Sequence, residues 1–600
     1  MSRKTELFYH NPTTPKADMS VSRGRIYAFI NCPADLRGIP FGTLMKFHVR
    51  MIPNTGETIV KAILTGFILT ILSTSDACAD SQASSAPLPC TLKLDLQRRT
   101  PESDHLLIQS ETIDSRRIGI VVIDMWNGYM CPTGSELFGN SLITRMNHAL
   151  EGARRLGMVV IHAPSDVADL YAGWPQAEKV AALPRYELPE AIATLSPRFP
   201  DSQDACLCGP GLLCRYMHSW DAIHPQLFIS ESDYILVGAA YGKRGTQRLH
   251  AICRDRNLTH LIYAGCATNC CVVAKAAGAL YMAQSGIQVL LARDLTEAVT
   301  RYDPNTGYTP DDGTSESVRA IERASFPTIA LASELKKVAL WKDHWITDPV
   351  HMFPHWSKPR EPYLFEDSFF MTLSTPRVTN DTIHYTEDGS EPSPETPRYT
   401  SPLKISSTGV IRTKSFRNGL PVSLESKSYH HRLIPEPPKP DLALSDIVPI
   451  RATAPGYLHG HTSKGIAPNI QFNRSFTKQS LRLQGRVFAK GIGVHAPSQL
   501  LFKIKPDYKR FVALVGIDDQ ILDHDSGMHV AHLPSVVFRV FIDGKLISES
   551  PVMRTGRVWR FNIPIATHNS TISLATMDAA DGRFQDIASW VDAGFTLRKP

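Results

Sequence analysis

A cysteine-rich turn, GCATNCC at residues 265–271, contains the residue types that nucleophilic catalysis needs. An apolar run at 261–265 precedes it, and a helical pattern begins at about Cys271 and stops before Gly286. A thiol at a helix N-terminus lies beside unpaired N–H groups and the positive end of the helix dipole, which stabilise a thiolate. Neighbouring backbone amides could bind the oxyanion of an acyl intermediate. Cys271 is therefore a candidate nucleophile with a lowered pKa, although a small buried cysteine would give the same pattern.

The elements that must position this turn are short apolar runs that alternate with helical patterns between residues 115 and 335. Such runs are typical of buried parallel strands joined by crossover helices, which predicts an α/β fold with a three-layer parallel sheet. The predicted strands are 118–124, 158–162, 234–237, 261–265 and 287–294. In these sheets the site lies at the carboxyl ends of the strands, where Asp124, His162 and the cysteine-rich turn all fall.

The sequence GCATNCCV at 265–272 resembles the G-x-A-T-[DN]-x-C-V nucleophile motif of the isochorismatase-like cysteine hydrolases. IGIVVIDMWNGYM from residue 118 and MVVIHAPSD from residue 158 follow the family's order, and the resemblance covers about residues 115–335. It implies a hydrolase that acts on an amide, acyl or enol-ether bond of a small molecule. A homodimer is the assembly that the resemblance suggests.

The resemblance assigns roles to residues of the turn and of the first strand. Cys271 would attack a carbonyl to form a thioester that water releases, and Asp124 would take the thiol proton. The amides of Ala267 and Cys271 would bind the oxyanion, with a cis peptide between Cys266 and Ala267. Asp124 could instead be a structural carboxylate that caps the following turn. Trp126 and His162 are candidates for the substrate pocket.

The sequence departs from the family pattern at its catalytic lysine. The family's lysine belongs at the end of the third strand, where Val237 or Gly238 stands. Lys243, in the following loop, could bring a cation to the thiol, although a solvated charge would fit the loop equally well. The paired histidine ligands of nicotinamidases have no match after Asp124, so we expect no catalytic metal and no cofactor. A degenerate, non-catalytic domain in a polysaccharide-binding or scaffolding protein is the alternative.

Two β domains are predicted after residue 340, where Pro-rich loops and alternating strands replace the helical periods. Residues 383–419, with the turn at Asp388-Gly389, resemble the C-terminal β-sandwich of chitobiase and β-hexosaminidase chains. Residues 441–600 resemble the NPCBM family of carbohydrate-binding modules, a jelly roll like galactose-binding domains, which implies a glycan partner. The candidate sugar-binding residues are Trp590, His495, Asp518 and Asp586. Alternatively, Trp590 fills the core and the aspartates set turns.

An apolar run from Ala62 to Leu72, preceded by basic residues and followed by Ala77-Cys78-Ala79, resembles a secretory signal peptide at residues 45–79. A buried core helix is the alternative. Cleavage after Ala79 would leave nine cysteines, an odd number, which predicts one free thiol. We therefore expect a secreted, periplasmic or cell-surface protein, with residues 1–44 upstream of the true start or disordered.

Composition excludes several classes of function. The chain has 43 % hydrophobic and 20 % charged residues, and no stretch supplies the roughly 18 apolar residues of a membrane-spanning helix. A net charge of +6 over 600 residues, without a run of basic and aromatic residues, argues against a nucleic-acid partner.

Since a single hydrophobic core cannot include 600 residues, we predict three domains. Their predicted ranges are 80–340 for the hydrolase domain, 345–433 for the first sandwich and 442–600 for the last domain, with a Pro-rich linker at 434–441.

Overall fold

A computed structural model divides the chain into two compact units, Met1–Ala86 and Pro87–Pro600. The structure describes residues 17–22, 25–30, 91–129, 131–165, 167–188, 207–208, 222–237, 243–324, 326–338, 349–375, 381–454, 470–523 and 533–598. In the first unit these residues form an antiparallel pair, β1 (Ala17–Ser22) and β2 (Arg25–Ile30). The predicted signal peptide at 45–79 lies outside the described residues.

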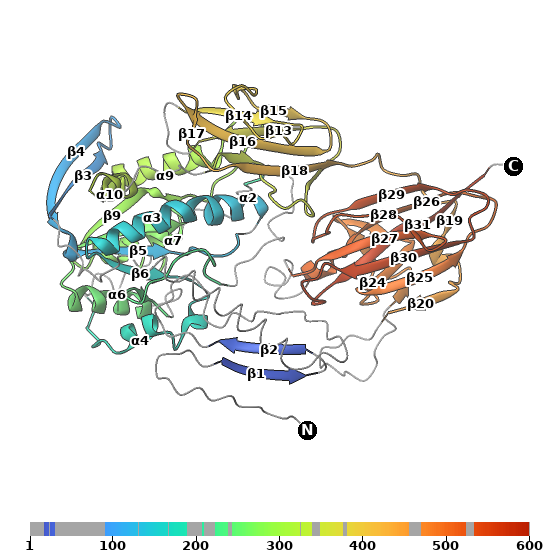
Figure 1. Cartoon of the computed structure of the whole chain (residues 1–600), viewed down its shortest axis with the longest axis horizontal. Coiled ribbons are helices and arrows are strands. Elements are labelled where there is room, and N and C mark those ends of the chain that lie inside the picture. Colours follow the sequence, from blue (N-terminus) through green and yellow to red (C-terminus); the bar gives the residue numbers. More distant parts are fainter. Residues whose placement is uncertain are drawn as a thin grey trace, which may run out of the picture. The chain divides into compact units, whose positions relative to one another are not determined.

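The α/β domain is built on an eight-stranded sheet with the order β4-β3-β10-β9-β8-β5-β6-β7. Figure 1 labels its strands β3, β4, β5, β6 and β9. Its six strands from β10 to β7 are parallel, and the five predicted strands are among them. The antiparallel hairpin β3–β4 extends the sheet at one edge and was not predicted. The strands are β3 (Thr91–Arg99), β4 (Leu106–Asp114), β5 (Ile118–Ile123), β6 (Val159–Ala163), β7 (Tyr234–Ile235), β8 (His260–Cys266), β9 (Gln288–Glu297) and β10 (Thr328–Ile329).

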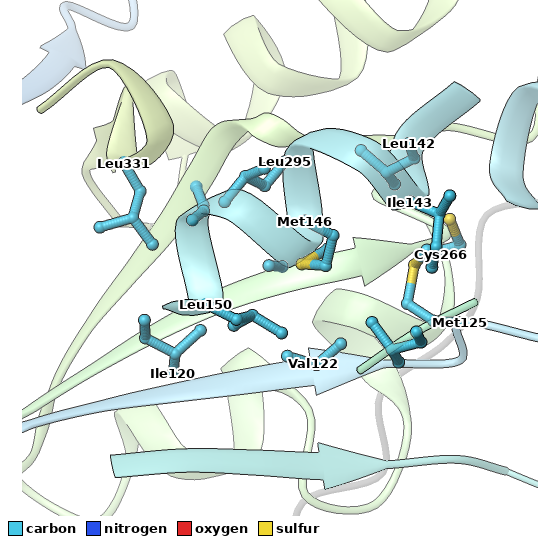
Figure 2. Close-up of a cluster of buried hydrophobic side chains, with 14 of the residues drawn as sticks. Ile120, Val122, Met125, Leu142, Ile143, Met146, Leu150, Cys266, Leu295 and Leu331 are labelled. Carbon is cyan, nitrogen blue, oxygen red and sulfur yellow. The ribbon is translucent and has the colours of Figure 1, made fainter. Parts of the chain in front are cut away.

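Helices cover both faces of this sheet. On one face Ile120 and Val122 pack with Met146 and Leu150 of α3, as Figure 2 shows. On the other face, alternate residues of β5 share an apolar cluster with α6. The helices are α2 (Pro132–Gly134), a π-helical turn (Ser135–Ser141), α3 (Leu142–Arg155), α4 (Pro175–Ala181), α6 (Lys243–Asp255), α7 (Cys271–Ala274), α8 (Ala279–Ala283), α9 (Pro310–Ala324) and α10 (Leu331–Val338). No helix in the described ranges has the length and apolar character to cross a bilayer.

The first β domain consists of two small sheets around a shared apolar core that includes Phe365, Met371 and Ile411. Its predicted turn is confirmed at Gly389, whose φ of 81° is accessible to glycine without steric cost. The strands are β11 (His351–Phe353), β12 (Tyr363–Phe365), β13 (Phe369–Ser374), β14 (Thr382–Thr386), β15 (Leu403–Ile405), β16 (Gly409–Arg417), β17 (Leu420–Pro421) and β18 (Ser426–Arg432).

The last domain is a sandwich of two antiparallel sheets, β21-β24-β31-β26-β29 with β19, and β20-β25-β30-β27-β28. Phe511 from one sheet and Phe538 from the other lie in one apolar core. The all-β prediction is confirmed here, and the jelly-roll topology stays a prediction. The strands are β19 (Leu442–Ala443), β20 (Arg451–Thr453), β21 (Ile470–Phe472), β22 (Leu481–Leu483), β23 (Arg486–Phe488), β24 (Gly491–His495), β25 (Ser498–Lys503), β26 (Tyr508–Ile517), β27 (Val536–Ile542), β28 (Lys545–Glu549), β29 (Trp559–Pro564), β30 (Thr571–Asp578) and β31 (Ile587–Leu597).

Candidate active site

The cysteine-rich turn follows the carboxyl end of β8. The peptide bond between Cys266 and Ala267 is cis, as expected, and Cys271 is the first residue of α7. The helix predicted up to Gly286 is instead two short helices, because the chain leaves the helical conformation at Lys275 and resumes it at Ala279. With a single turn, α7 has a much smaller dipole than the predicted helix, so the dipole contributes less to a thiolate than the sequence suggested.

The break in the helix turns the side chain of Lys275 into the protein. Lys275 is 4 % exposed, and its Nζ donates to Oδ1 of Asp124 at 2.8 Å and to Oγ of Ser165 at 2.8 Å. A third donation goes to the carbonyl of Ala163. All three donors of the ammonium are therefore used, which is the condition for burying this charge at tolerable cost.

Asp124 directly follows β5 and is 1 % exposed. Its Oδ1 also accepts from the backbone N–H of Ser165 at 2.6 Å, and its Oδ2 accepts from the hydroxyl of Ser165 at 3.0 Å. The backbone carbonyl of Asp124 accepts from the hydroxyl of Tyr129. Ser165 and Lys275 thus hold the carboxylate in one orientation at the carboxyl edge of the sheet.

The two adjacent thiols of the turn interact. Sγ of Cys271 donates to Sγ of Cys270 over 3.9 Å. This hydrogen bond, burial and the negative charge of Asp124 raise the pKa of Cys271, while the cation of Lys275 opposes the shift. The same hydrogen bond lowers the pKa of Cys270. The low pKa predicted for Cys271 is therefore wrong for the resting site, where Cys271 is a thiol that needs a base.

The predicted oxyanion donors are the amides of Ala267 and Cys271. The carbonyl of Ala267 accepts from the N–H groups of Cys270 and Val272, which fixes the shape of the turn. Outside helices and strands, neither the Ala267 nor the Cys271 amide donates to another backbone group among the described residues. Both stay candidate donors to an oxyanion.

The candidate pocket residues Trp126 and His162 have different surroundings. Trp126 is 7 % exposed and donates from Nε1 to the carbonyl of Ser165 at 3.2 Å, so it packs against the residue that holds Asp124. His162 contacts Asp233 at 3.0 Å, and Arg154 binds the same carboxylate at 2.6 Å. Burial alone would raise the pKa of Asp233, but these two partners lower it to about 2. The contacts of His162 thus belong to a buried ion-pair cluster.

The buried cation beside Asp124 is Lys275, which was not among the candidates from the sequence, and the role expected of Lys243 stays a prediction. Lys243 begins α6, and its side chain lies outside the described residues. Lys275 is the single lysine between residues 263 and 286 and stands four positions after Cys271. Its nearness to the nucleophile in the sequence was the available signal, and it was missed because the cation was sought at the third strand.

The candidate sugar-binding residues of the last domain are buried. Trp590 is fully buried, donates from Nε1 to Thr576 at 2.9 Å and stacks on Phe561, so it cannot present a face to a sugar in this structure. This corrects its assignment as a sugar contact and supports the alternative of a core residue. The other three candidates, which are 0–6 % exposed, are Asp518, Asp586 and His495.

Asp518 and Asp586 differ in how they are satisfied. Asp518 accepts from the hydroxyl of Ser589 at 2.7 Å, and burial raises its pKa. Asp586 accepts from the backbone N–H of Ser535 at 2.9 Å through Oδ1, and burial raises its pKa to about 8.

In the described part of the chain, no group of three or more His, Cys, Asp or Glu side chains could hold a metal ion.

Comparison with family models finds three domain types in the predicted order. The isochorismatase domain matches residues 210–309, the chitobiase/β-hexosaminidase C-terminal domain matches 365–427, and the NPCBM/NEW2 domain matches 455–596. The chain therefore combines an isochorismatase-like hydrolase domain with a carbohydrate-binding module, which confirms the suspected architecture.

Individual relatives match parts of the chain. Ureidoacrylate amidohydrolase RutB of Klebsiella pneumoniae is 28 % identical over 189 residues, which is 30 % of this chain and 74 % of that protein. Alpha-1,3-galactosidase B of Akkermansia muciniphila is 33 % identical over 125 residues, 20 % of this chain, and the match spans only 15 % of the galactosidase. A solved cysteine hydrolase from Pseudomonas syringae is 16 % identical over 40 % of this chain and 96 % of its own, with a TM-score of 0.24, too low to bear on the fold.

Proposed function

We propose that this chain, with its isochorismatase-like domain and its carbohydrate-binding module, is an exported cysteine hydrolase that cleaves a C–N bond of a small amide. The observation that carries the proposal is the buried ion pair between Asp124 and Lys275, whose two charges both act on the thiol of Cys271. A nucleophile, a base and a cation at the carboxyl edge of a parallel sheet are the parts that acyl transfer through a thioester requires.

In the proposed reaction Asp124 takes the proton of Cys271 as Sγ attacks the carbonyl carbon. The S–C bond forms and the carbonyl π electrons move to oxygen, which the amides of Ala267 and Cys271 stabilise. The C–N bond then breaks, and the proton held by Asp124 goes to the leaving nitrogen. Water attacks the thioester and gives a proton to Asp124, the C–S bond breaks with release of the acid, and Asp124 returns that proton to Sγ of Cys271.

The cation of Lys275 makes this proton transfer electrostatically acceptable in a buried site. Before transfer, the cation is paired with the carboxylate of Asp124; after transfer, Asp124 is neutral and the negative charge lies on Cys271. The net charge of the buried site is the same in both states, and the ammonium stays hydrogen-bonded to Ala163 and Ser165. The ammonium of Lys275 therefore keeps a counter-charge, first on Asp124 and then on Cys271. A buried cation without a counter-charge would be costly.

The amide class is supported by the name of one relative, an amidohydrolase, which matches over the hydrolase domain. Ester and enol-ether bonds are the competing classes. Export is supported by the signal-peptide pattern at 45–79 and by the carbohydrate-binding module, which would hold the enzyme at a glycan. The sugar would bind a surface other than the face of Trp590.

The test is a substrate panel of primary amides, ureido acids, esters and enol ethers, with wild-type protein and the variants Cys271→Ala and Lys275→Met. The proposal expects release of ammonia or amine that depends on Cys271 and falls in the lysine variant. Hydrolysis confined to esters or enol ethers would reject the amide class. Turnover that persists in Cys271→Ala would reject the cysteine mechanism as a whole.

A further inference from the structure

We propose that Cys270 and Cys271 also form a redox-active pair, which hydroperoxides convert into a reversible disulfide. Their Sγ atoms lie 3.9 Å apart and share a hydrogen bond, so no other atom separates them. A disulfide needs about 2.05 Å between the sulfurs, which requires rotation of both side chains together with a local change of the backbone in the turn. The inference rests on the two thiols and holds whether or not the domain hydrolyses amides.

The pair differs in accessibility from the other cysteines that the structure describes. Cys270 and Cys271 are partly exposed, whereas the remaining four are buried: Cys131, Cys208, Cys253 and Cys266. Burial raises the pKa of Cys253 to about 12 and raises that of Cys266 as well. Hydroperoxides react with thiolates, and Cys270 has a lowered pKa. Within the described chain, oxidation should therefore begin at this pair.

The chemistry is balanced with a hydroperoxide as the oxidant. A thiolate of the pair attacks the terminal peroxide oxygen, the O–O bond breaks, and a sulfenic acid and an alcohol or water result. The second thiol attacks the sulfenic sulfur, the S–S bond forms, and the S–O bond breaks with loss of water. Two thiols and one hydroperoxide thus give one disulfide, one alcohol or water, and one further water. The product is the same whichever thiol reacts first.

The position of the pair makes the disulfide easy to reduce. Adjacent Cα atoms are about 3.8 Å apart across a trans peptide, closer than the roughly 4.4–6.8 Å usual in disulfides. Such strain raises the reduction potential, which is typical of regulatory rather than structural disulfides. Because Cys271 carries the proposed nucleophile, closing the ring would switch the site off, and reduction would restore it.

The experiment treats the reduced full chain with hydrogen peroxide and maps the peptide that contains both cysteines by mass spectrometry. We expect that peptide to become lighter by two hydrogen atoms and to regain its mass and both alkylatable thiols after treatment with dithiothreitol. Sulfinic or sulfonic acid on Cys271 with Cys270 still reduced would overturn the proposal. A disulfide from either residue to a third cysteine would also overturn it.

The variant Cys270→Ser removes the second thiol and keeps its size. In this variant we expect peroxide to convert Cys271 into sulfinic and sulfonic acids that dithiothreitol does not reverse. The matched control is Cys253→Ala, which removes a buried cysteine and should leave the mass loss unchanged. Reversible protection of Cys271 in the Cys270→Ser variant would contradict the role of Cys270, and the wild-type mass measurement stands even where the variant folds poorly.

Discussion

Nζ of Lys275 lies 2.8 Å from Oδ1 of Asp124, although the two residues are 151 positions apart in the chain. Asp124 directly follows strand β5, and Lys275 directly follows the one-turn helix that begins with Cys271. The nucleophile and its cation therefore come from the same turn of chain, and the base comes from the neighbouring strand. Their relative geometry depends on the pairing of β5 with β8.

The buried pair predicts a large loss of stability when only its cation is removed. Lys275→Met leaves the carboxylate of Asp124 buried without its counter-charge, which should lower the free energy of unfolding by about 3–5 kcal/mol. Urea unfolding measures this loss. The double variant Asp124→Asn with Lys275→Met should recover part of it, because no charge then remains unpaired.

A control separates this effect from the loss of any lysine. Lys404 is exposed on β15, so Lys404→Met should change the free energy of unfolding by less than about 0.5 kcal/mol. If Lys275→Met were as harmless as Lys404→Met, or if the double variant were no more stable than Lys275→Met, the ion pair would have no role in stability.

Asp124→Asn should raise the rate at which Cys271 is alkylated and lower the rate of hydrolysis. The negative charge of Asp124 raises the pKa of Cys271, so its removal should lower that pKa and speed alkylation by iodoacetamide near neutral pH. Hydrolysis should fall by about 10²–10⁴-fold, because the variant has no base for the thiol or for water. The pH dependence of alkylation and the steady-state rate measure the two effects. A fall in both the alkylation rate of Cys271 and the rate of hydrolysis would indicate simple disruption of the site.

The last domain should lose stability as pH rises from about 4 to 8. The folded-state pKa of Asp586 is about 8, well above the value of 3.8 for the free side chain, so the folded state binds the proton more tightly. Its contribution is fully present below the unfolded-state pKa and disappears as pH rises through the folded-state pKa, a loss on the order of a few kcal/mol. Urea unfolding of the last domain at several pH values measures the decline.

Asp586→Asn tests the origin of that decline. The amide oxygen of Asn can still accept from Ser535, and the side chain no longer titrates, so the decline between pH 4 and 8 should shrink. Asp507→Asn, at an exposed position, is the matched control and should keep the decline of the wild type. An unchanged decline in Asp586→Asn would assign the pH dependence to another group.

Local sequence patterns predicted much of the fold. The apolar runs located β5, β6, β8 and β9 because buried parallel strands need apolar residues on both faces. The hairpin β3–β4 was missed although residues 91–99, TLKLDLQRR, alternate with the period of a half-buried strand. That alternation is visible in the sequence and predicts a strand. The position of the hairpin at the edge of the sheet is not visible, because β3 pairs with β10, which lies far away in the sequence.

The candidate site could be predicted only in part. The nucleophile motif located Cys271 in the turn after β8, and the apolar run of β5 located Asp124, which directly follows that strand. The inward turn of Lys275 depends on a helix that stops after four residues and on acceptors from Asp124 and Ser165, none of which a local pattern shows. Likewise, the raised pKa of Cys271 arises from its hydrogen bond to Cys270, from burial and from neighbouring charges, which only the packed fold defines.

The most direct test of the central claim is to trap the acyl-enzyme with an activated ester such as p-nitrophenyl acetate, followed by acid quench and peptide mass mapping. If Cys271 is the nucleophile and Asp124 the base that also activates water, the acetyl group should lie on Cys271 as a thioester. It should accumulate to a higher level in Asp124→Asn, whose thioester hydrolyses slowly, and be absent from that peptide in Cys271→Ala. Acetylation of Cys270 instead, or equal release of nitrophenol by Cys271→Ala, would contradict the assignment of the site.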